Sequence, residues 1–248
     1  MRRYWIESSQ IENDQVVFSG EQLHHLRDVC RLQPGSKFEV LFEGSQAHFV
    51  EMIEVGKKQA SARILETRQI PSLPKPLIHL AISLPKFQKF ETVIEKAVEL
   101  GVSRILPFVS DFSFIRDLNK VSESKKQRWQ KIVVGATQQT GRGDLLQVAD
   151  PIRWSQLFDQ INRVDRNECL FLYEGSGQLN LKQAFEQIQP REVESIWLII
   201  GSEGGFSDRE VEQMVNGGLR PVTLGDQVLR VETACIAAAS MAHFHFRL

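Results

Sequence analysis

Two glycine-rich turns in the last third of the sequence could hold a ligand, and two charged residues follow the second turn. The first turn, residues 201–205, comes directly after the apolar run 196–200. The second begins at Gly225 and leads to Arg230 and Glu232, which stand among apolar neighbours. Glycine lets a backbone approach a ligand closely because no Cβ intervenes, and charges in apolar surroundings tend to be paired or functional. We therefore expect one ligand pocket at the carboxyl ends of adjacent parallel strands. The alternative is two tight turns and a structural Arg–Glu pair.

The elements that must position these turns are indicated by the pattern around them. Residues 195–200 and 221–224 are short apolar runs of the kind that form buried strands. Ser207 and Glu210 have the spacing of a capping box, which predicts a helix start directly after the first turn. Residues 234–246 are apolar nearly all round and predict a last helix buried on more than one side.

Strand and helix patterns also alternate upstream of the two turns. Residues 87–100 have the pattern of an amphipathic helix, and Gly101 is expected to end it because glycine readily adopts the left-handed conformation found there. The other predicted elements are strands at 77–84, 102–107 and 169–173 and helices at 124–139 and 181–188. This alternation predicts an α/β domain with a mainly parallel sheet.

Residues 1–70 have a different pattern. Apolar and polar residues alternate over 38–42, 49–53 and 60–64, which predicts half-buried antiparallel strands of a sandwich or small barrel. One short helix is expected at about 21–30. Three prolines lie within residues 70–76, and proline removes backbone donors and stiffens the chain. We therefore place a domain boundary there and expect domains at 1–70 and 71–248.

Several functional classes lack their characteristic residues. The first turn has neither the lysine of a P-loop nor the three-glycine spacing of a dinucleotide fingerprint. The six histidines and three cysteines show no metal-ligand spacing, and no Ser-His-Asp set is suggested. No apolar run approaches the roughly 20 residues that span a bilayer, and the first residues do not have the pattern of a signal peptide. Because Cys30, Cys169 and Cys235 are scattered, we expect no disulfide framework and a cytoplasmic location.

The charge is unevenly distributed although the net charge is only −1. Residues 71–150 carry 12 Lys and Arg against 8 Asp and Glu, whereas residues 151–248 carry 9 against 13. A basic face beside a more acidic one could hold a polyanion and a small cationic ligand on different surfaces. Ordinary fluctuation in composition is the alternative.

Two C-terminal motifs resemble those of the RsmE family, the small-subunit ribosomal RNA uridine-N3 methyltransferases of the SPOUT, or trefoil-knot, superfamily. They are Leu-Ile-Ile-Gly-Ser-Glu-Gly-Gly-Phe-Ser at 198–207 and Leu-Gly-x-x-Val-Leu-Arg-x-Glu-Thr-Ala at 224–234. The resemblance covers nearly the whole chain, and Ser202 stands where the family usually has a proline. Further segments that resemble the family lie at 24–31, 96–102 and 138–142.

The resemblance implies a fold, a cofactor and an activity. Residues 71–248 would form a knotted, mostly parallel α/β domain with flanking helices, and residues 1–70 a small PUA-like β-barrel that binds RNA. The protein would be an S-adenosylmethionine-dependent methyltransferase acting on uridine N3 of 16S ribosomal RNA. The implied cofactor-binding residues are Leu172, Tyr173, Glu174, Ile200, Gly201, Glu203, Gly205, Leu224, Gly225, Val228, Leu229, Arg230, Thr233 and Ala234.

Arg230 and Glu232 would be the catalytic residues. Uridine N3 carries a weakly acidic proton, which must leave before or as N3 attacks the methyl group. Arg230 would stabilise negative charge developing on the uracil carbonyls, and Glu232 would position the arginine or help to remove the proton. The sulfonium of the cofactor is cationic, so that a carboxylate such as Glu203 is tolerated beside it. No metal is expected.

The implied partners are small-subunit ribosomal RNA, free or assembled into a subunit, and a second copy of the chain. A homodimer would form through the knot and the last helix, and no membrane association is expected. The residues expected to contact RNA are Arg2, Arg3, Arg27, Arg31, Lys86, Lys89 and Arg142. Two alternatives remain: a trefoil-knot methyltransferase for another RNA, such as tRNA, and an RNA-binding assembly factor without catalytic activity.

Overall fold

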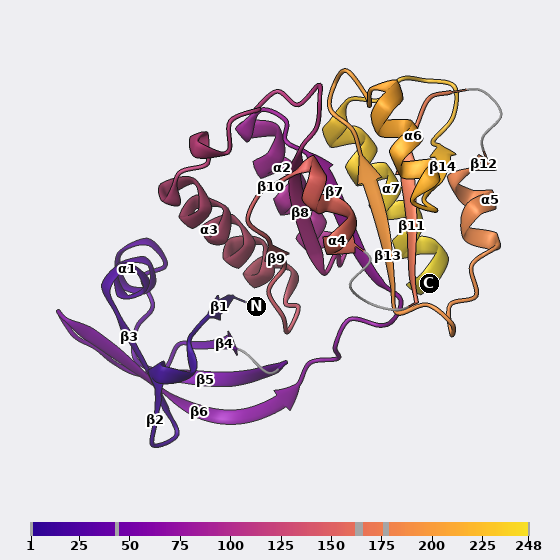
Figure 1. Ribbon diagram of the computed structural model, residues 1–248. Coiled ribbons are helices and arrows are strands. Elements are labelled where there is room, and N and C mark those ends of the chain that lie inside the picture. The colour runs from indigo at the N-terminus through magenta and orange to yellow at the C-terminus, as the bar shows by residue number, and fades with distance from the viewer. Residues whose placement is uncertain (1, 43–44, 162–165, 176–178, 248) are drawn as a thin grey trace. The chain divides into compact units, whose positions relative to one another are not determined.

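Two separate sheets organise the chain, one in each of two units. The first unit is Met1–Ser72 with Thr137–Leu145, and the second is Leu73–Ala136 with Leu146–Leu248. The computed structural model in Figure 1 describes residues 2–42, 45–161, 166–175 and 179–247. Residues 137–145, which the sequence pattern placed with the second domain, thus belong to the first unit.

The first unit is built on a curled six-stranded sheet with the strand order β1-β4-β5-β6-β3-β2. Register shifts between β5 and β6, of the kind that β-bulges cause, bend this long hairpin. The expected strands are present, but β1 pairs with β4 in parallel, so the sheet is not purely antiparallel as the alternation had suggested. The strands are β1 (Arg3–Trp5), β2 (Ile11–Glu12), β3 (Gln15–Ser19), β4 (Lys37–Phe42), β5 (Gln46–Val55) and β6 (Gln59–Gln69).

A helical segment covers the core of this sheet. It consists of α1 (Gly20–His24) and a π-helical turn (His25–Val29), which together match the helix expected at 21–30. Leu23 and Leu26 lie on its inner side and pack in one cluster with Phe18 and Phe38, all of them buried. Burial of these large apolar side chains is the main stabilising contribution in this small unit.

The second unit is built on an eight-stranded sheet whose registered strand pairs are all parallel. Its main order is β10-β8-β7-β13-β11-β14-β12, and β9 also pairs with β8. The strands are β7 (Leu77–Ser83), β8 (Arg104–Val109), β9 (Gln147–Val148), β10 (Ile152–Arg153), β11 (Asn167–Leu172), β12 (Leu179–Asn180), β13 (Ser195–Ile200) and β14 (Arg220–Thr223).

Helices cover both faces of this parallel sheet (Figure 1). Every residue of β13 is buried, which explains why its sequence is continuously apolar rather than alternating. The helices are α2 (Phe87–Glu99), α3 (Glu123–Thr140), α4 (Leu157–Ile161), α5 (Leu181–Glu186), α6 (Asp208–Asn216) and α7 (Val231–Arg247), with short 3-10 turns at Leu118–Lys120 and Trp154–Gln156.

The two faces of the sheet have different helices. On one face, Trp197 and Ile199 of β13 pack with Leu157 of α4 and Met214 of α6. On the other face, α7 packs against β7 and β13, and α2 packs against α7. The Arg247 guanidinium donates a hydrogen bond to the Gly101 carbonyl (2.7 Å), which ties the end of α7 to the end of α2. None of the helices in the described ranges is long and apolar enough to cross a membrane.

Candidate active site

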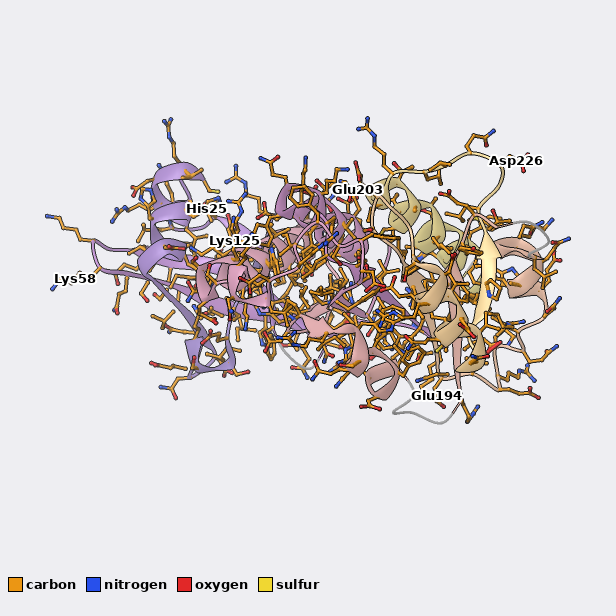
Figure 2. The ribbon with its side chains drawn as sticks, turned by 45° about the horizontal axis from the view of Figure 1, so that its top comes forward. His25, Lys58, Lys125, Glu194, Glu203 and Asp226 are labelled. Atoms are coloured by element: carbon orange, nitrogen blue, oxygen red, sulfur yellow. The ribbon has the colours of Figure 1, made fainter. Side chains whose placement is uncertain are left out.

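A cavity of about 210 Å³ lies where β11, β13 and β14 end, and both glycine turns line it. The two turns follow β13 and β14, which are not neighbours: β11 lies between them and pairs in parallel with both. The expectation of a pocket on adjacent strands is therefore wrong in this detail, and the residues after β11 form part of the wall for this reason. Figure 2 shows Glu203 and Asp226, one from each turn, at the same end of the unit, with Glu194, which precedes β13, at the other end.

Most of the cofactor-binding residues inferred from the sequence line this cavity. They are Leu172, Tyr173, Glu174, Ile200, Gly201, Gly205, Leu224, Gly225, Leu229 and Ala234. Glu203, Val228, Arg230 and Thr233 do not line it and are exposed. The lining also includes residues that were not predicted from the sequence, namely Ser202, Gly204, Phe206, Thr223, Gln227 and Val231. All of them lie in or beside the same two turns, so treating each turn as a whole would have found them.

The first glycine turn is tightly closed by its own backbone. The Gly205 amide donates to the Ser202 carbonyl (2.9 Å), and Gly205 has a φ of +69°. A Cβ at Gly201 would lie 3.1 Å from the Gly205 carbonyl and 3.2 Å from the Phe206 ring. The Ser202 hydroxyl accepts a hydrogen bond from the Gly204 amide (3.3 Å). Ser202 thus stabilises by hydrogen bonding a turn in which the family usually has a proline.

The helix after this turn begins as predicted. The Ser207 hydroxyl accepts from the Glu210 amide (3.3 Å), and the Glu210 carboxylate accepts from the Ser207 amide (3.0 Å). Glu210 is fully buried and also accepts from the Asp111 amide (2.8 Å), so it joins the start of α6 to the loop after β8. The capping box therefore fixes the direction in which the first turn leaves the pocket.

An ion-pair cluster stands between the first turn and the start of α7. Lys89 Nζ lies 2.9 Å from Glu203 Oε1 and 3.4 Å from Glu232 Oε2. The hydrogen bond to Glu203 is the largest cause that raises the pKa of Lys89, with further contributions from the charges of both carboxylates. Burial acts to raise the pKa of Glu203, but the hydrogen bonds and the charges of Lys89 and Lys86 outweigh it and lower the pKa. Lys89 therefore stays protonated, and its single positive charge offsets part of the negative charge of the two carboxylates.

Arg230 precedes α7 and is exposed, not enclosed by its apolar neighbours as the sequence had suggested. Its carbonyl accepts from the Ala234 amide (2.8 Å), which sets its position at the helix start. Within the described ranges, its guanidinium makes neither a hydrogen bond nor an ion pair. Glu232 forms an ion pair with Lys89, and the Arg230–Glu232 pair considered from the sequence is absent among these residues. The guanidinium is thus available to a ligand.

The arginines expected to contact RNA differ in how they are held. Arg3 donates to Glu39 (2.8 Å), a nearly buried carboxylate that also pairs with Arg68 (2.6 Å). Arg142 pairs with Asp144 (2.8 Å), and its side chain is only 8% exposed. These two arginines therefore stabilise the first unit, whatever else they contact.

Arg2, Arg27 and Arg31 are less enclosed. Arg27 pairs with Asp28 (2.7 Å), and this bond raises the pKa of Arg27. Arg2 donates to the Cys30 carbonyl (2.9 Å). Arg31 is exposed, and its side chain has no hydrogen bond or ion pair with any described residue. Arg31 is therefore the most accessible cation of the three.

Two of the three cysteines, Cys169 and Cys235, lack the surroundings of nucleophiles. Burial raises the pKa of the Cys169 thiol to about 12, with the charge of Glu168 adding to this, and burial also raises the pKa of the Cys235 thiol. Reactive cysteines have lowered pKa values because the thiolate is the nucleophile. Among the described residues, no group of three or more His, Cys, Asp or Glu could hold a metal ion.

The parallel sheet with its flanking helices, the glycine-lined pocket and the small curled sheet together define an RNA methyltransferase of the SPOUT class with a PUA domain. A family model described as an RNA methyltransferase domain matches residues 71–243. A second model, described as an RNA methyltransferase PUA domain, matches residues 18–65.

Individual relatives identify the family within this class to which the chain belongs. The chain is 30% identical to ribosomal RNA small subunit methyltransferase E of Bacillus subtilis, across 100% of this chain and 98% of the relative. It is 33% identical to the Synechocystis sp. protein of the same name, over 94% of this chain and 74% of the relative. The crystal structure of the Neisseria gonorrhoeae methyltransferase E bound to S-adenosylmethionine superposes with a TM-score of 0.80, at 26% identity and covering 96% and 95% of the two chains. The chain belongs to the family of ribosomal RNA small subunit methyltransferase E.

Proposed function

We propose that this protein transfers a methyl group from S-adenosylmethionine to N3 of a uridine in small-subunit (16S) ribosomal RNA. The observation that carries the proposal is the glycine-lined cavity with the unpaired Arg230 and the Lys89–Glu203–Glu232 cluster beside it. Family membership supports the same reaction, because the relatives are named for ribosomal RNA of the small subunit.

The cavity suits S-adenosylmethionine in its chemistry. Its wall combines apolar side chains, which suit the adenine ring, with polar groups, and the two glycine turns bring backbone groups close to the ligand. The lining, which lies entirely within the described residues, contains Glu174 and no lysine or arginine. A cationic ligand is therefore not repelled there. When bound, the cofactor supplies an electrophilic methyl group on its sulfonium.

We assign the chemical steps on uracil to residues at the start of α7. Arg230 approaches the uracil carbonyls and stabilises the negative charge that develops on oxygen as N3 loses its proton. Glu232 accepts that proton, directly or through one water. Lys89 holds Glu232 and Glu203 at the rim of the cavity, so neither carboxylate competes with the substrate for Arg230.

We propose RNA binding for the first domain, residues 1–70, and catalysis for the knotted second domain, residues 71–248. The match of a PUA model to residues 18–65 supports the first assignment. Arg2, Arg27 and Arg31 then contact phosphates, which position RNA without reading its sequence. The reaction takes place in the cytoplasm, on free RNA or on the assembled subunit.

We further propose a homodimer through α7. The inner side of this helix, with Ala234, Cys235, Ala238 and Ala242, is buried within the unit. Its outer side carries the partly exposed Ile236 and Met241 and the 72% exposed Phe244. An exposed apolar stripe on a helix is typical of a surface that packs against a partner.

The reaction is tested by methyl transfer from labelled S-adenosylmethionine to small subunits from a strain that lacks the protein. Digestion to nucleosides should place the label in 3-methyluridine. Label in another nucleoside would overturn the assignment to N3. Labelling of tRNA in preference to small subunits would support a different RNA substrate. Normal cofactor binding with no transfer to any RNA would support the inactive assembly factor.

A further inference from the structure

The loop between β8 and the turn at Leu118–Lys120 reverses the usual distribution of polar and apolar side chains. Ser110 and Ser113 are buried, at 4% and 2% exposure, whereas Phe112 and Phe114 are 46% and 59% exposed. Exposed aromatic rings lose the burial that normally stabilises a fold. Two of them at alternate positions of one loop indicate a binding surface rather than a packing element.

Buried hydrogen bonds hold this loop in place. The Ser83 hydroxyl lies 2.6 Å from the Ser110 hydroxyl and 2.8 Å from that of Ser113, and the Ser110 amide donates to Ser113 Oγ (2.7 Å). The Ile115 side chain is buried and its amide donates to the Leu84 carbonyl (3.3 Å). The two rings are therefore exposed on an ordered backbone and lose little conformational freedom on binding a ligand.

The loop borders the cofactor cavity. A Cβ at Gly204 would lie 3.1 Å from the Phe112 Cβ, so Phe112 lies directly against the first glycine turn. Lys86 Nζ lies 4.9 Å from the centroid of the Phe114 ring, within the range of a cation–π contact. Aromatic surface and positive charge thus occur together beside the first glycine turn.

A second cavity of about 290 Å³ is lined by other residues of the same loop, among them Asp111 and Arg116. Arg116, Arg153 and Arg209 line it together with Asp111. Asp111 pairs with Arg209 (2.8 Å), and the hydrogen bond from Ser207 is the largest cause that lowers the pKa of Asp111. The other two arginines are left in excess over the carboxylate, and both are exposed. A pocket with this charge suits a phosphate group.

We propose that residues 110–116 form an RNA-recognition loop, in which Phe112 and Phe114 stack on unpaired bases next to the target uridine. The arginine-lined cavity holds a phosphate of the same strand. This inference rests on the proposed function, since it supplies the substrate contact that the cofactor pocket itself lacks. Unpaired bases are the partner that this combination fits, because every base offers a π-face to an aromatic ring and every nucleotide a phosphate to an arginine.

The test compares two double variants of the full-length protein. Phe112→Leu with Phe114→Leu removes both rings but keeps apolar side chains, and Phe112→Tyr with Phe114→Tyr keeps both rings. Affinity is measured for small subunits from a strain that lacks the protein, and S-adenosylmethionine affinity is measured separately. The leucine variant should bind subunits more weakly by roughly 5- to 150-fold for each base stack that is lost. The tyrosine variant should bind like the wild type, and both should bind the cofactor normally.

A second measurement tests the phosphate contact. Arg116→Ala with Arg153→Ala should reduce the slope of log affinity against log salt by roughly 0.7 for each lost contact to a single strand. An unchanged slope would remove the arginine-lined cavity from the proposal.

Other outcomes separate this inference from the proposed function. If wild type methylates subunits and the leucine variant binds them equally well, the recognition loop is wrong and the enzyme assignment stands. If the leucine variant loses as much affinity for the cofactor as for subunits, the loop is a wall of the cofactor pocket and not an RNA contact. A changed sedimentation coefficient of the leucine variant would show that the two rings pack against a second copy of the chain. If wild type neither binds nor methylates any RNA, both proposals fail.

Discussion

The ammonium nitrogen of Lys89 lies 2.9 Å from the carboxylate oxygen Oε1 of Glu203. Lys89 is on α2 and Glu203 is in the first glycine turn, so this bond connects α2 to the turn that lines the cofactor cavity. The same nitrogen reaches Glu232 in the first turn of α7. One lysine thus connects the turn that lines the pocket to the helix that carries the catalytic candidates.

The Lys89–Glu203 pair should stabilise the protein only over a defined pH range. The raised pKa of Lys89 contributes stability below its unfolded value of about 10.4, which is lost as the pH rises through the folded value. The lowered pKa of Glu203 contributes stability above its unfolded value of about 4.3, which is lost as the pH falls through the folded value. Wild type and Lys89→Met should therefore differ in Tm near neutral pH and converge at both extremes.

Lys89→Arg is the matched control, because it keeps the charge and should keep the difference from Lys89→Met. The Tm of each variant is measured by thermal unfolding, followed by circular dichroism, at a series of pH values. A Tm difference that does not change from pH 3 to pH 11 would show that the charges do not interact.

Arg230→Ala should lower single-turnover methyl transfer by on the order of 10²- to 10³-fold, the cost of removing one preorganised charge-stabilising donor. Its guanidinium is exposed and does not line the cofactor cavity, so cofactor affinity should change little. Isothermal titration with S-adenosylmethionine measures the cofactor affinity, and a quench assay with small subunits measures the single-turnover rate of methyl transfer. Unchanged turnover would remove Arg230 from the chemistry.

Gly201→Ala should weaken cofactor binding, because the added methyl group would lie 3.1 Å from the Gly205 carbonyl and force the first turn open. Gly135→Ala is the control: nothing lies within 4 Å of its Cβ, and the site is inside α3. Alanine is a better helix former than glycine by roughly 1 kcal/mol, so this variant should be more stable and bind normally. Equal cofactor affinity of the two variants would contradict the role of the tight turn.

Arg31→Ala and Arg3→Ala should have different effects. Arg3 pairs with the nearly buried Glu39, and its loss should destabilise the first unit by roughly 1–3 kcal/mol in chemical denaturation. Arg31 has an exposed side chain, so its loss should leave stability unchanged but flatten the salt dependence of RNA binding. An identical salt slope for wild type and Arg31→Ala would exclude Arg31 from the RNA contact.

Phe244→Glu should shift the protein from dimer to monomer, since it places a charge in the exposed apolar stripe of α7. Val215→Glu is the control, because Val215 is an exposed apolar residue on α6. Sedimentation velocity at several concentrations distinguishes the two states. A wild type that sediments as a monomer at all concentrations would contradict the proposed dimer.

Much of the second unit could be predicted from local pattern. The apolar run ending at Ile200 and the capping box at Ser207 predicted β13, the first turn and the start of α6, because each signal involves residues close in sequence. The RsmE resemblance extended this to the family and to most residues of the cavity wall. The parallel pairing of β1 with β4 was missed, since alternation reports which face is buried and not the direction of a neighbouring strand.

The sequence by itself determined the kinds of element, the two glycine turns and the family, because short-range periodicity and motif spacing carry that information. Only the tertiary structure placed β11 between the strands that carry the two turns and brought Lys89 to Glu203 and Glu232. Only the tertiary structure determines that Phe112 and Phe114 are exposed to solvent on a loop held by buried serines. These relationships join residues far apart in the chain, and they depend on how the sheet and its helices pack, which no local pattern specifies.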